Sequence, residues 1–284
     1  MNTFSSYLKK KFGEPVYKVS IDAGFKCPNK PRCNFCNLDS YVPESANKFK
    51  SMEEQLHDGI EFYKKHRKAK KFLAYFQANT NSNAEIEVLE SLYKRAMEYS
   101  DKIVGLSIST RPDCVNTEFA ELIKRIGEKK LTFVELGLQS IFNDDLLWLN
   151  RQHTFEQFLD AHKILSQHGT SLIIHLMFGL PNDTEDKMIK TAETLSELGV
   201  FGVKIHHLHV VKHTKLEKMY YNNEFTPVTL EKYIQLITTF IKHLDPKITI
   251  HRLIADTPDE LLIAPRWTLG KQEIISKIRT NLHC

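Results

Sequence analysis

Three of the five cysteines lie within ten residues, at Cys27, Cys33 and Cys36. Sulfur ligands select zinc, copper(I) or iron–sulfur clusters. A closed structural zinc site usually has four ligands in two separate pairs, and the sequence has no second Cys-x-x-Cys pair. A cluster of four irons held by three thiolates leaves one iron open for a cofactor or substrate. We favour this interpretation; the alternatives are zinc with Cys114 or a distant histidine as the fourth ligand, and unligated structural cysteines.

The spacing of the cysteines resembles that of the radical S-adenosylmethionine (SAM) superfamily. Its usual motif is Cys-x3-Cys-x2-Cys with an aromatic residue before the last cysteine, which is Phe35 here. The first gap has five residues instead of three. Such a lengthened gap is typical of the YhcC/YtqA type, a branch related to the elongator catalytic subunits. The resemblance implies a 4Fe-4S cluster on Cys27, Cys33 and Cys36, with SAM as the second cofactor.

The resemblance also implies a radical mechanism. The amino and carboxylate groups of SAM would chelate the open iron, and one electron would cleave the sulfonium bond to give methionine and a 5′-deoxyadenosyl radical. That radical abstracts a hydrogen atom from the substrate, while the protein orients the reactants and excludes water. A reducing partner such as flavodoxin or ferredoxin would supply the electron.

Polar residues at the ends of predicted strands are the candidates for holding SAM, because chemistry in parallel barrels gathers at the carboxyl ends of the strands. Arg151 follows Gln139 by twelve residues, the offset that the resemblance implies for a pair that grips SAM. A planar guanidinium suits the SAM carboxylate. Gln77 and Asn79 replace a Gly-Gly-Glu-like turn of other members and lack its negative charge. The expected SAM contacts are Gln77, Asn79, Ser109, Gln139, Arg151 and His175.

An acid is predicted to point into the barrel. Glu135, Gly137 and Gln139 share one face of a predicted strand, because side chains alternate along a strand. An acid and an amide that face a barrel interior are costly unless they bind something. Their Glu-Leu-Gly-x-Gln-Ser run also resembles one that is common in this branch. We therefore expect Glu135 to face the substrate.

Histidines supply further candidates. His153 lies in an Arg-Gln-His-Thr run that resembles Arg-Gly-His-Thr in elongator-like proteins, with glutamine in place of glycine. Four histidines occur within eight residues from His206 onward, which makes zinc an alternative there. His206 and His207 project to opposite faces of a strand, however, so we interpret this stretch as pocket lining. The residues expected to face the substrate are Glu135, His153, Lys204, His206 and His209.

These residues are positioned by a repeating pattern of a short apolar strand followed by an amphipathic helix, which predicts an α/β fold with a parallel sheet. Six strands are expected at 16–21, 71–76, 103–108, 131–136, 171–177 and 202–207, and residues 248–253 can form a seventh. The resemblance implies a partial (β/α)6 barrel of the TIM type. We expect a single domain over residues 1–284, with the barrel at about 16–210 and a short α/β C-terminal extension at about 211–284.

The composition is that of a soluble globular protein, with 42% hydrophobic and 26% charged residues among 284. No apolar run approaches the roughly 20 residues that span a bilayer, and the N-terminus lacks the order of a signal peptide. An odd number of cysteines argues against a disulfide framework and for a reducing compartment. We expect a cytoplasmic protein with no membrane partner.

The net charge of +4 does not identify a partner, but basic runs occur at 9–11 and 64–71. They are either solvated helix ends or a patch that contacts phosphates. The resemblance implies tRNA as substrate and conversion of wobble 5-carboxymethylaminomethyl-(2-thio)uridine to 5-aminomethyl-(2-thio)uridine. The alternatives are a radical SAM oxidoreductase for a small carboxylated substrate and a non-enzymatic, metal-stabilised RNA-binding protein.

Overall fold

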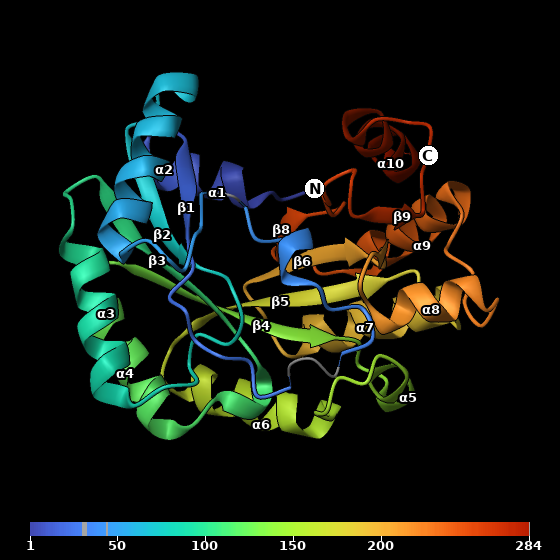
Figure 1. The fold of residues 1–284 in the computed structure, drawn as a ribbon, viewed down its shortest axis with the longest axis horizontal. Coiled ribbons are helices and arrows are strands. Elements are labelled where there is room, and N and C mark those ends of the chain that lie inside the picture. Colours follow the sequence, from blue (N-terminus) through green and yellow to red (C-terminus); the bar gives the residue numbers. More distant parts are fainter. Residues whose placement is uncertain (30–32, 44, 284) are drawn as a thin grey trace.

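The computed structural model describes residues 1–29, 33–43 and 45–283. Seven parallel strands form one sheet in the order β1-β2-β3-β4-β5-β6-β8, which curls into an open half-barrel (Figure 1). The strands are β1 (Val16–Ile21), β2 (Lys71–Phe76), β3 (Ile103–Thr110), β4 (Leu131–Gln139), β5 (Ser171–Phe178), β6 (Gly202–His207) and β8 (Thr249–Arg252). The expected α/β partial barrel with its small C-terminal extension is confirmed, and the seventh strand is present.

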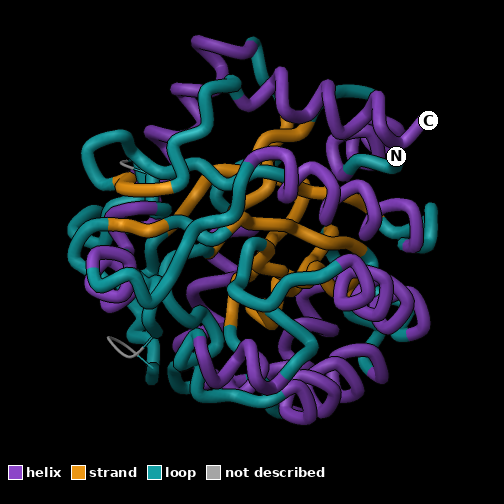
Figure 2. Tube along the Cα trace, turned by 90° about the vertical axis from the view of Figure 1, so that its right-hand side faces the viewer, coloured by secondary structure: helices purple, strands orange, loops and turns teal. Residues whose placement is uncertain are grey.

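Helices cover the outer face of the sheet, as Figure 2 shows in purple around the orange strands. They are α2 (Met52–Arg67), α3 (Ile86–Glu98), α4 (Thr117–Gly127), α6 (Phe155–Gln167), α7 (Glu185–Glu197) and α9 (Leu230–His243). Helix α5 (Asn143–Trp148) follows the carboxyl end of β4, α10 (Lys271–His283) packs against α9, and α1 (Phe4–Phe12) lies at the N-terminal end. Side chains before several helices accept an N–H of the first turn, as at Ser51, Asn116 and Thr154. Such caps satisfy donors that the helix leaves unpaired, so the sequence determines where these helices begin.

Short elements were harder to predict. The antiparallel pair β7 (Val210–Val211) and β9 (Leu262–Ala264) and the helix α8 (Lys215–Tyr221) were not expected, because so few residues show no period. β4 also continues beyond the expected end at residue 136. The strand runs through Gly137 without a break. The glycine leaves room for Arg151, because a Cβ there would lie 2.7 Å from Nη2 of that arginine.

Helix α1 closes the N-terminal end of the half-barrel. Phe4 and Leu8 of this helix pack with Leu73, Phe133 and Ile173, which point inward from three strands. The rings of Phe4 and Phe133 meet edge to face with centroids 5.2 Å apart. Because inward-facing residues alternate, the next inward position on each strand lies one layer closer to the carboxyl end. That layer is polar.

The chain after β6 completes the edge of the sheet. β8 pairs with β6 in parallel, and α9 packs against both α7 and α10 (Figure 1). The division of the chain near residue 210 stays a prediction. Among the helices of the described residues, none is long and apolar enough to cross a membrane.

Candidate active site

A cavity of about 770 Å³ extends from the cysteine loop at the carboxyl ends of the strands to Phe4 of α1. All seven strands of the sheet contribute lining residues. Of the predicted site residues, only Glu135 and His153 do not line it, although both contact residues that do. The predicted residues that line the cavity are Cys27, Cys33, Cys36, Gln77, Asn79, Ser109, Gln139, Arg151, His175, Lys204, His206 and His209.

The loop that carries the cysteines is fixed to the segment after α5. The backbone N–H of Asn34 donates to the carbonyl oxygen of Leu149 at 3.0 Å, and its side-chain amide donates to the carbonyl oxygen of Trp148. Phe35 packs against an apolar cluster that includes Leu149. The aromatic residue of the motif therefore anchors the loop over the strand ends.

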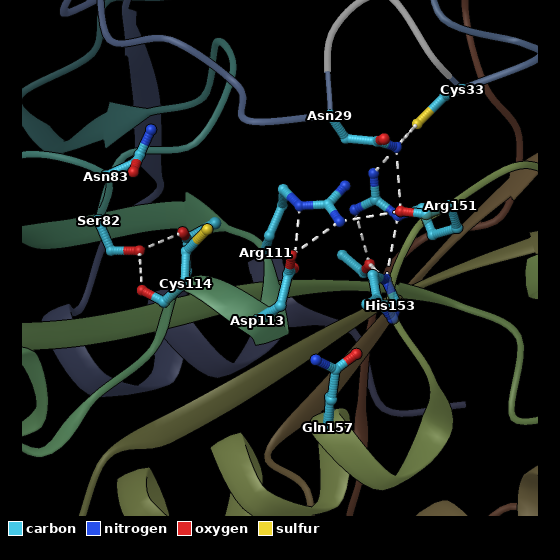
Figure 3. A network of polar contacts seen from close by, with 12 residues as sticks. Asn29, Cys33, Ser82, Asn83, Arg111, Asp113, Cys114, Arg151, His153 and Gln157 are labelled. Atoms are coloured by element: carbon cyan, nitrogen blue, oxygen red, sulfur yellow. Dashed lines mark hydrogen bonds and ion pairs between the residues drawn. The ribbon is translucent and has the colours of Figure 1, made fainter.

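The three thiols line one end of the cavity. The side-chain amide of Asn29 donates to Sγ of Cys33 at 2.9 Å, and Nη1 of Arg151 lies 3.7 Å from the same sulfur (Figure 3). Burial, together with Cys33 and Cys27, raises the pKa of the Cys36 thiol to about 11. A cationic iron centre would convert such a thiol into a thiolate ligand, because bound metal displaces the proton. The donor set fits a 4Fe-4S cluster.

Arg151 is held in one orientation. Its Nε–H donates to Nε2 of His153 at 3.1 Å, and Nη2 donates to the carbonyl oxygen of Gly137 at 2.8 Å (Figure 3). Burial and the neighbouring guanidinium lower the pKa of His153 to about 4, so the ring is neutral and Nε2 can accept. His153 thus orients Arg151, and its predicted contact with the substrate stays a prediction.

A second arginine braces the first. Nε of Arg111 lies 2.9 Å from Oδ1 of Asp113 in an ion pair, and Nη2 donates to the carbonyl oxygen of Arg151 at 2.9 Å (Figure 3). Cys114 follows in the same turn and is not among the residues that line the cavity. Burial and Asp113 raise the pKa of its thiol to about 11. Cys114 is therefore a protonated thiol beside the site.

Several buried polar atoms at the cavity have no hydrogen-bond partner among the described residues. They belong to lining residues and include Oδ1 of Asn29, Oδ1 of Asn79, Oγ1 of Thr80, Nη1 of Arg111, Nε2 of His206 and Nδ1 of His251. Asn79 and Gln139 also have φ angles of 59° and 79°, in a region that few side chains adopt. Buried polar groups are normally satisfied, so these atoms indicate a polar ligand. SAM, with carboxylate, amine, ribose and adenine groups, together with a polar substrate fits this set.

Glu135 is fully buried at the centre of a polar network. Its Oε2 lies 2.6 Å from Nε2 of His175 and 3.1 Å from Nζ of Lys204. Burial alone would raise the pKa of Glu135, but Lys18 and Lys204 outweigh it and hold that pKa well below its ordinary value. The carboxylate is therefore ionised. Five side chains from five strands contact it: Lys18, Tyr75, Ser107, His175 and Lys204.

Neither Lys18, Tyr75 nor Ser107 was predicted as a site residue. Lys18 lies in an otherwise largely apolar strand. Its neighbour Val19 is buried against the helices, with only 1% of its surface exposed. Alternation thus puts Lys18 on the inner face. That signal is in the sequence, but its partner Glu135 lies 117 positions away and only strand order brings the two together.

Lys204 is a titratable group within this layer. Its pKa is lowered to about 7. Burial is the main cause, Arg252 and Lys18 lower the pKa further, and Glu135 opposes them by raising it. Burial and Lys204 similarly lower the pKa of His175 to about 4. His175 is therefore neutral and donates through Nε2 to the carboxylate. Near neutral pH, Lys204 can hold or release a proton inside the cavity.

His207 and His209, at the end of β6 and just after it, contact each other. Nε2 of His207 and Nε2 of His209 share a hydrogen bond, and Nδ1 of His209 lies 2.6 Å from Oγ1 of Thr257. Burial lowers the pKa of His209 to about 4. Within the described ranges, no three His, Cys, Asp or Glu side chains are grouped to hold one metal ion. A four-iron cluster is larger than one ion, so this does not bear on the cysteines.

Comparisons with known proteins agree with this geometry. A profile of the radical SAM superfamily matches residues 23–195, and one of the radical SAM C-terminal domain matches residues 200–283. The chain is 33% identical over 287 residues to the uncharacterized protein YtqA of Bacillus subtilis, covering 99% of this chain and 89% of YtqA. It is 34% identical over 274 residues to protein YhcC of Escherichia coli, covering 94% and 87%.

More distant similarities cover part of larger proteins. A tRNA uridine(34) acetyltransferase of Methanocaldococcus infernus is 32% identical over 184 residues, which are 63% of this chain and 34% of that protein. The solved structure of Methanocaldococcus infernus Elp3 with an N-terminal deletion has a TM-score of 0.72 at 22% identity, covering 94% of this chain and 62% of Elp3. This likeness shows the fold. The profile matches and the near-full-length identity show that the chain belongs to the radical SAM superfamily, whose cofactors are a 4Fe-4S cluster and SAM.

Proposed function

We propose that this radical SAM protein modifies the wobble uridine of tRNA. The reaction would convert 5-carboxymethylaminomethyl-(2-thio)uridine to 5-aminomethyl-(2-thio)uridine. A hydrogen atom would be abstracted from the N–CH2 carbon, the resulting radical would return one electron to the oxidised cluster, and water would hydrolyse the imine so that the two-carbon group leaves as glyoxylate. The observation that carries the proposal is the continuous cavity of about 770 Å³. It joins the cysteine loop to the charged layer, by which we mean Glu135 with Lys18, Lys204 and Arg252. A cavity of this size can hold a nucleoside beside SAM.

In this proposal, the part of the cavity next to the cysteine loop holds the cofactors. When bound there, the cluster and SAM would supply the radical chemistry, which is the abstraction of a hydrogen atom from the substrate. Arg151 binds the methionine carboxylate with its planar fork, and His153 keeps that fork in position. The cluster ligands are Cys27, Cys33 and Cys36, and the other SAM contacts are Gln77, Asn79, Ser109, Gln139 and His175.

The part of the cavity around Glu135 and Lys204 holds the substrate. Glu135 holds Lys204 in place, and Lys204, with a pKa of about 7, holds or releases a proton beside the reacting group. His206 and His209 line the same space and orient the substrate. The closed N-terminal end keeps bulk water away from the radical, because α1 fills it with apolar side chains.

Two observations support tRNA as the substrate. A relative is named for uridine(34) of tRNA. Exposed cations also lie at the cysteine loop: Lys26 precedes the first cysteine, and the carbonyl oxygen of Lys212 accepts from Asn37 at 2.9 Å. The basic run 64–71 instead ends where β2 begins, at the N-terminal edge of the sheet. A six-residue strand puts the two edges roughly 20 Å apart.

Charge reversal at the two places tests which of them contacts tRNA. Each phosphate contact that is lost should lower the slope of log affinity against log salt by about 1. We expect Lys26→Glu with Lys212→Glu to lower this slope. Lys65→Glu with Arg67→Glu is the matched pair in the basic run. An unchanged slope for one pair would exclude that surface from the tRNA interface.

The function itself is tested by the nucleosides of cellular tRNA. Without the protein, the 5-aminomethyl form should disappear and the 5-carboxymethylaminomethyl form should accumulate. Wild-type protein with a reduced flavodoxin or ferredoxin should reverse this in vitro, and Cys33→Ala should not. Cys114→Ala is the control, because that thiol lies outside the cavity lining. Identical wobble nucleosides with and without the protein would contradict the proposal and favour a small carboxylated substrate.

A further inference from the structure

The charged layer of the half-barrel holds more cations than anions. Lys18 and Lys204 both pair with the one carboxylate of Glu135, and Arg252 lies beside Lys204 at the matching position of the neighbouring strand. The histidine that contacts the same carboxylate, His175, is neutral. Even when Lys204, with a pKa of about 7, is neutral, Lys18 and Arg252 outnumber the one carboxylate of Glu135, so the layer has a surplus of positive charge.

Arg252 is the cation without a counter-charge. It lines the cavity and has no hydrogen-bond or ion-pair partner among the residues that the structure describes. It lies close enough to Lys204 for the two positive charges to disfavour each other. Nearby, Nε2 of His206 and Nδ1 of His251 are buried and also have no partner in the described part of the chain. The free N–H groups of Arg252 thus lie near two unpaired histidine nitrogens.

A purely structural role does not account for this arrangement. A layer that only filled the barrel would be more stable with matched charges or with apolar side chains. Here two cations share one carboxylate, and a third adds repulsion with no partner of its own. An anion that enters the cavity would relieve the repulsion and satisfy the free donors.

We infer that Arg252 and Lys204 form a carboxylate-binding subsite that selects an anionic substrate group. Glu135 and Tyr75 hold Lys204 in position, while the guanidinium of Arg252 is free to bind a carboxylate with two N–H groups. This inference rests on the proposed function and deepens it, because it assigns the carboxymethyl group of the wobble side chain to Arg252. The proposed function assigns the SAM carboxylate to a different arginine, Arg151, which lies beside Cys33.

The subsite is tested by binding without turnover. Reconstituted, SAM-loaded and unreduced protein is titrated with 5-carboxymethylaminomethyluridine and with its carboxamide, which has the same shape and no negative charge. Wild-type protein should prefer the acid. Arg252→Gln should weaken acid binding by about 10- to 100-fold, the range for hydrogen bonds to charged groups, and change amide binding little.

Two further variants keep this test specific. Arg279→Gln makes the same substitution at an exposed position of α10 and should change neither affinity. Arg252→Lys keeps the charge without the planar fork and should recover part of the acid affinity, which a misfolded variant would not do. Equal binding of acid and amide to the wild-type protein would overturn the inference. So would an acid affinity that Arg252→Gln leaves unchanged.

The tRNA assay separates this inference from the proposed function. If tRNA is not modified but the preference for the acid depends on Arg252, the subsite stands and the wobble-uridine assignment falls. If wild-type protein and Arg252→Gln modify tRNA equally well, the subsite falls and the proposed function stands.

Discussion

The cavity has two polar regions that are built in different ways. The region at the cysteine loop is made largely of loop residues. Apart from the Arg111–Asp113 ion pair, its two arginines donate to backbone carbonyl oxygens, to a neutral histidine and towards a thiol. The charged layer below it is made of strand residues, and its contacts join charged side chains directly. One region therefore depends on loop geometry and the other on sheet register.

This difference separates two roles. A loop-built site can adjust when a cofactor binds, and its arginines face cysteines that become anionic on a cluster. A layer fixed by seven paired strands cannot move easily, so its charge surplus must be met by the ligand. We expect changes in the charged layer to affect stability first, and changes near the cysteines to affect cofactor binding first.

The largest effect on stability should come from Glu135→Gln. This change leaves the buried Lys204 and the half-buried Lys18 without a counter-charge, and breaking a buried pair in this way costs about 3–5 kcal/mol. Chemical denaturation of the cluster-free protein measures the loss. Glu121→Gln, at an exposed position of α4, is the control. An equally stable Glu135→Gln variant would mean that the layer is hydrated and not a fixed network.

The unfolding free energies of wild type and Glu135→Gln should become more similar at acid pH. Because the folded state lowers the pKa of Glu135 below its ordinary 4.5, its stabilisation is present above that pH and is lost as pH falls through the folded value. The difference in unfolding free energy between wild type and Glu135→Gln should therefore shrink below about pH 4.5. Unfolding measured between neutral pH and pH 3 tests this. A constant difference would show that Glu135 stabilises the fold through its shape and not through its charge.

His153→Ala should have the opposite profile. The guanidinium of Arg151 loses the acceptor of its Nε–H but keeps the carbonyl oxygen of Gly137, so the fold should change little. SAM affinity of the reconstituted protein should fall by about 10-fold, as for other residues that orient a ligand-binding group. His153→Gln, whose amide oxygen can accept the same N–H, should recover part of it. Unchanged SAM binding in His153→Ala would exclude this positioning role.

The smallest effect is expected at Gln152, which has a φ of 59° where the resembling run of other proteins has glycine. Gln152→Gly should raise the free energy of unfolding by up to about 1 kcal/mol, because glycine adopts this φ without strain. Gln152→Ala keeps the Cβ and should bring no such gain. Thermal unfolding of the three proteins decides this, and a gain for alanine equal to that for glycine would point to a cause other than backbone strain.

The sequence predicted what depends on local pattern. The strand positions and the cysteine motif were both readable, because each depends on a few neighbouring residues. The open iron–sulfur interpretation likewise needed only residue type and spacing. These features come from alternation and ligand chemistry, which act over short distances.

The charged layer was not predictable in this way. Its members were either unassigned, as Lys18 and Arg252 were, or assigned singly, as Glu135 and Lys204 were. Strand order and register bring them together across the sheet, and no local pattern contains that information. The left-handed backbone at Gln139 was also missed, because nothing in the residue type requires it.

The central claim is that the cysteine end of the cavity carries radical SAM chemistry, and its most direct test is anaerobic. The chain is reconstituted with iron and sulfide and reduced with SAM, and 5′-deoxyadenosine is measured. We expect wild-type protein and Cys114→Ala to form it and Cys33→Ala to remain at background. A fully loaded, reducible cluster that yields none with or without tRNA, or a protein that takes up zinc and assembles no cluster, would contradict the account.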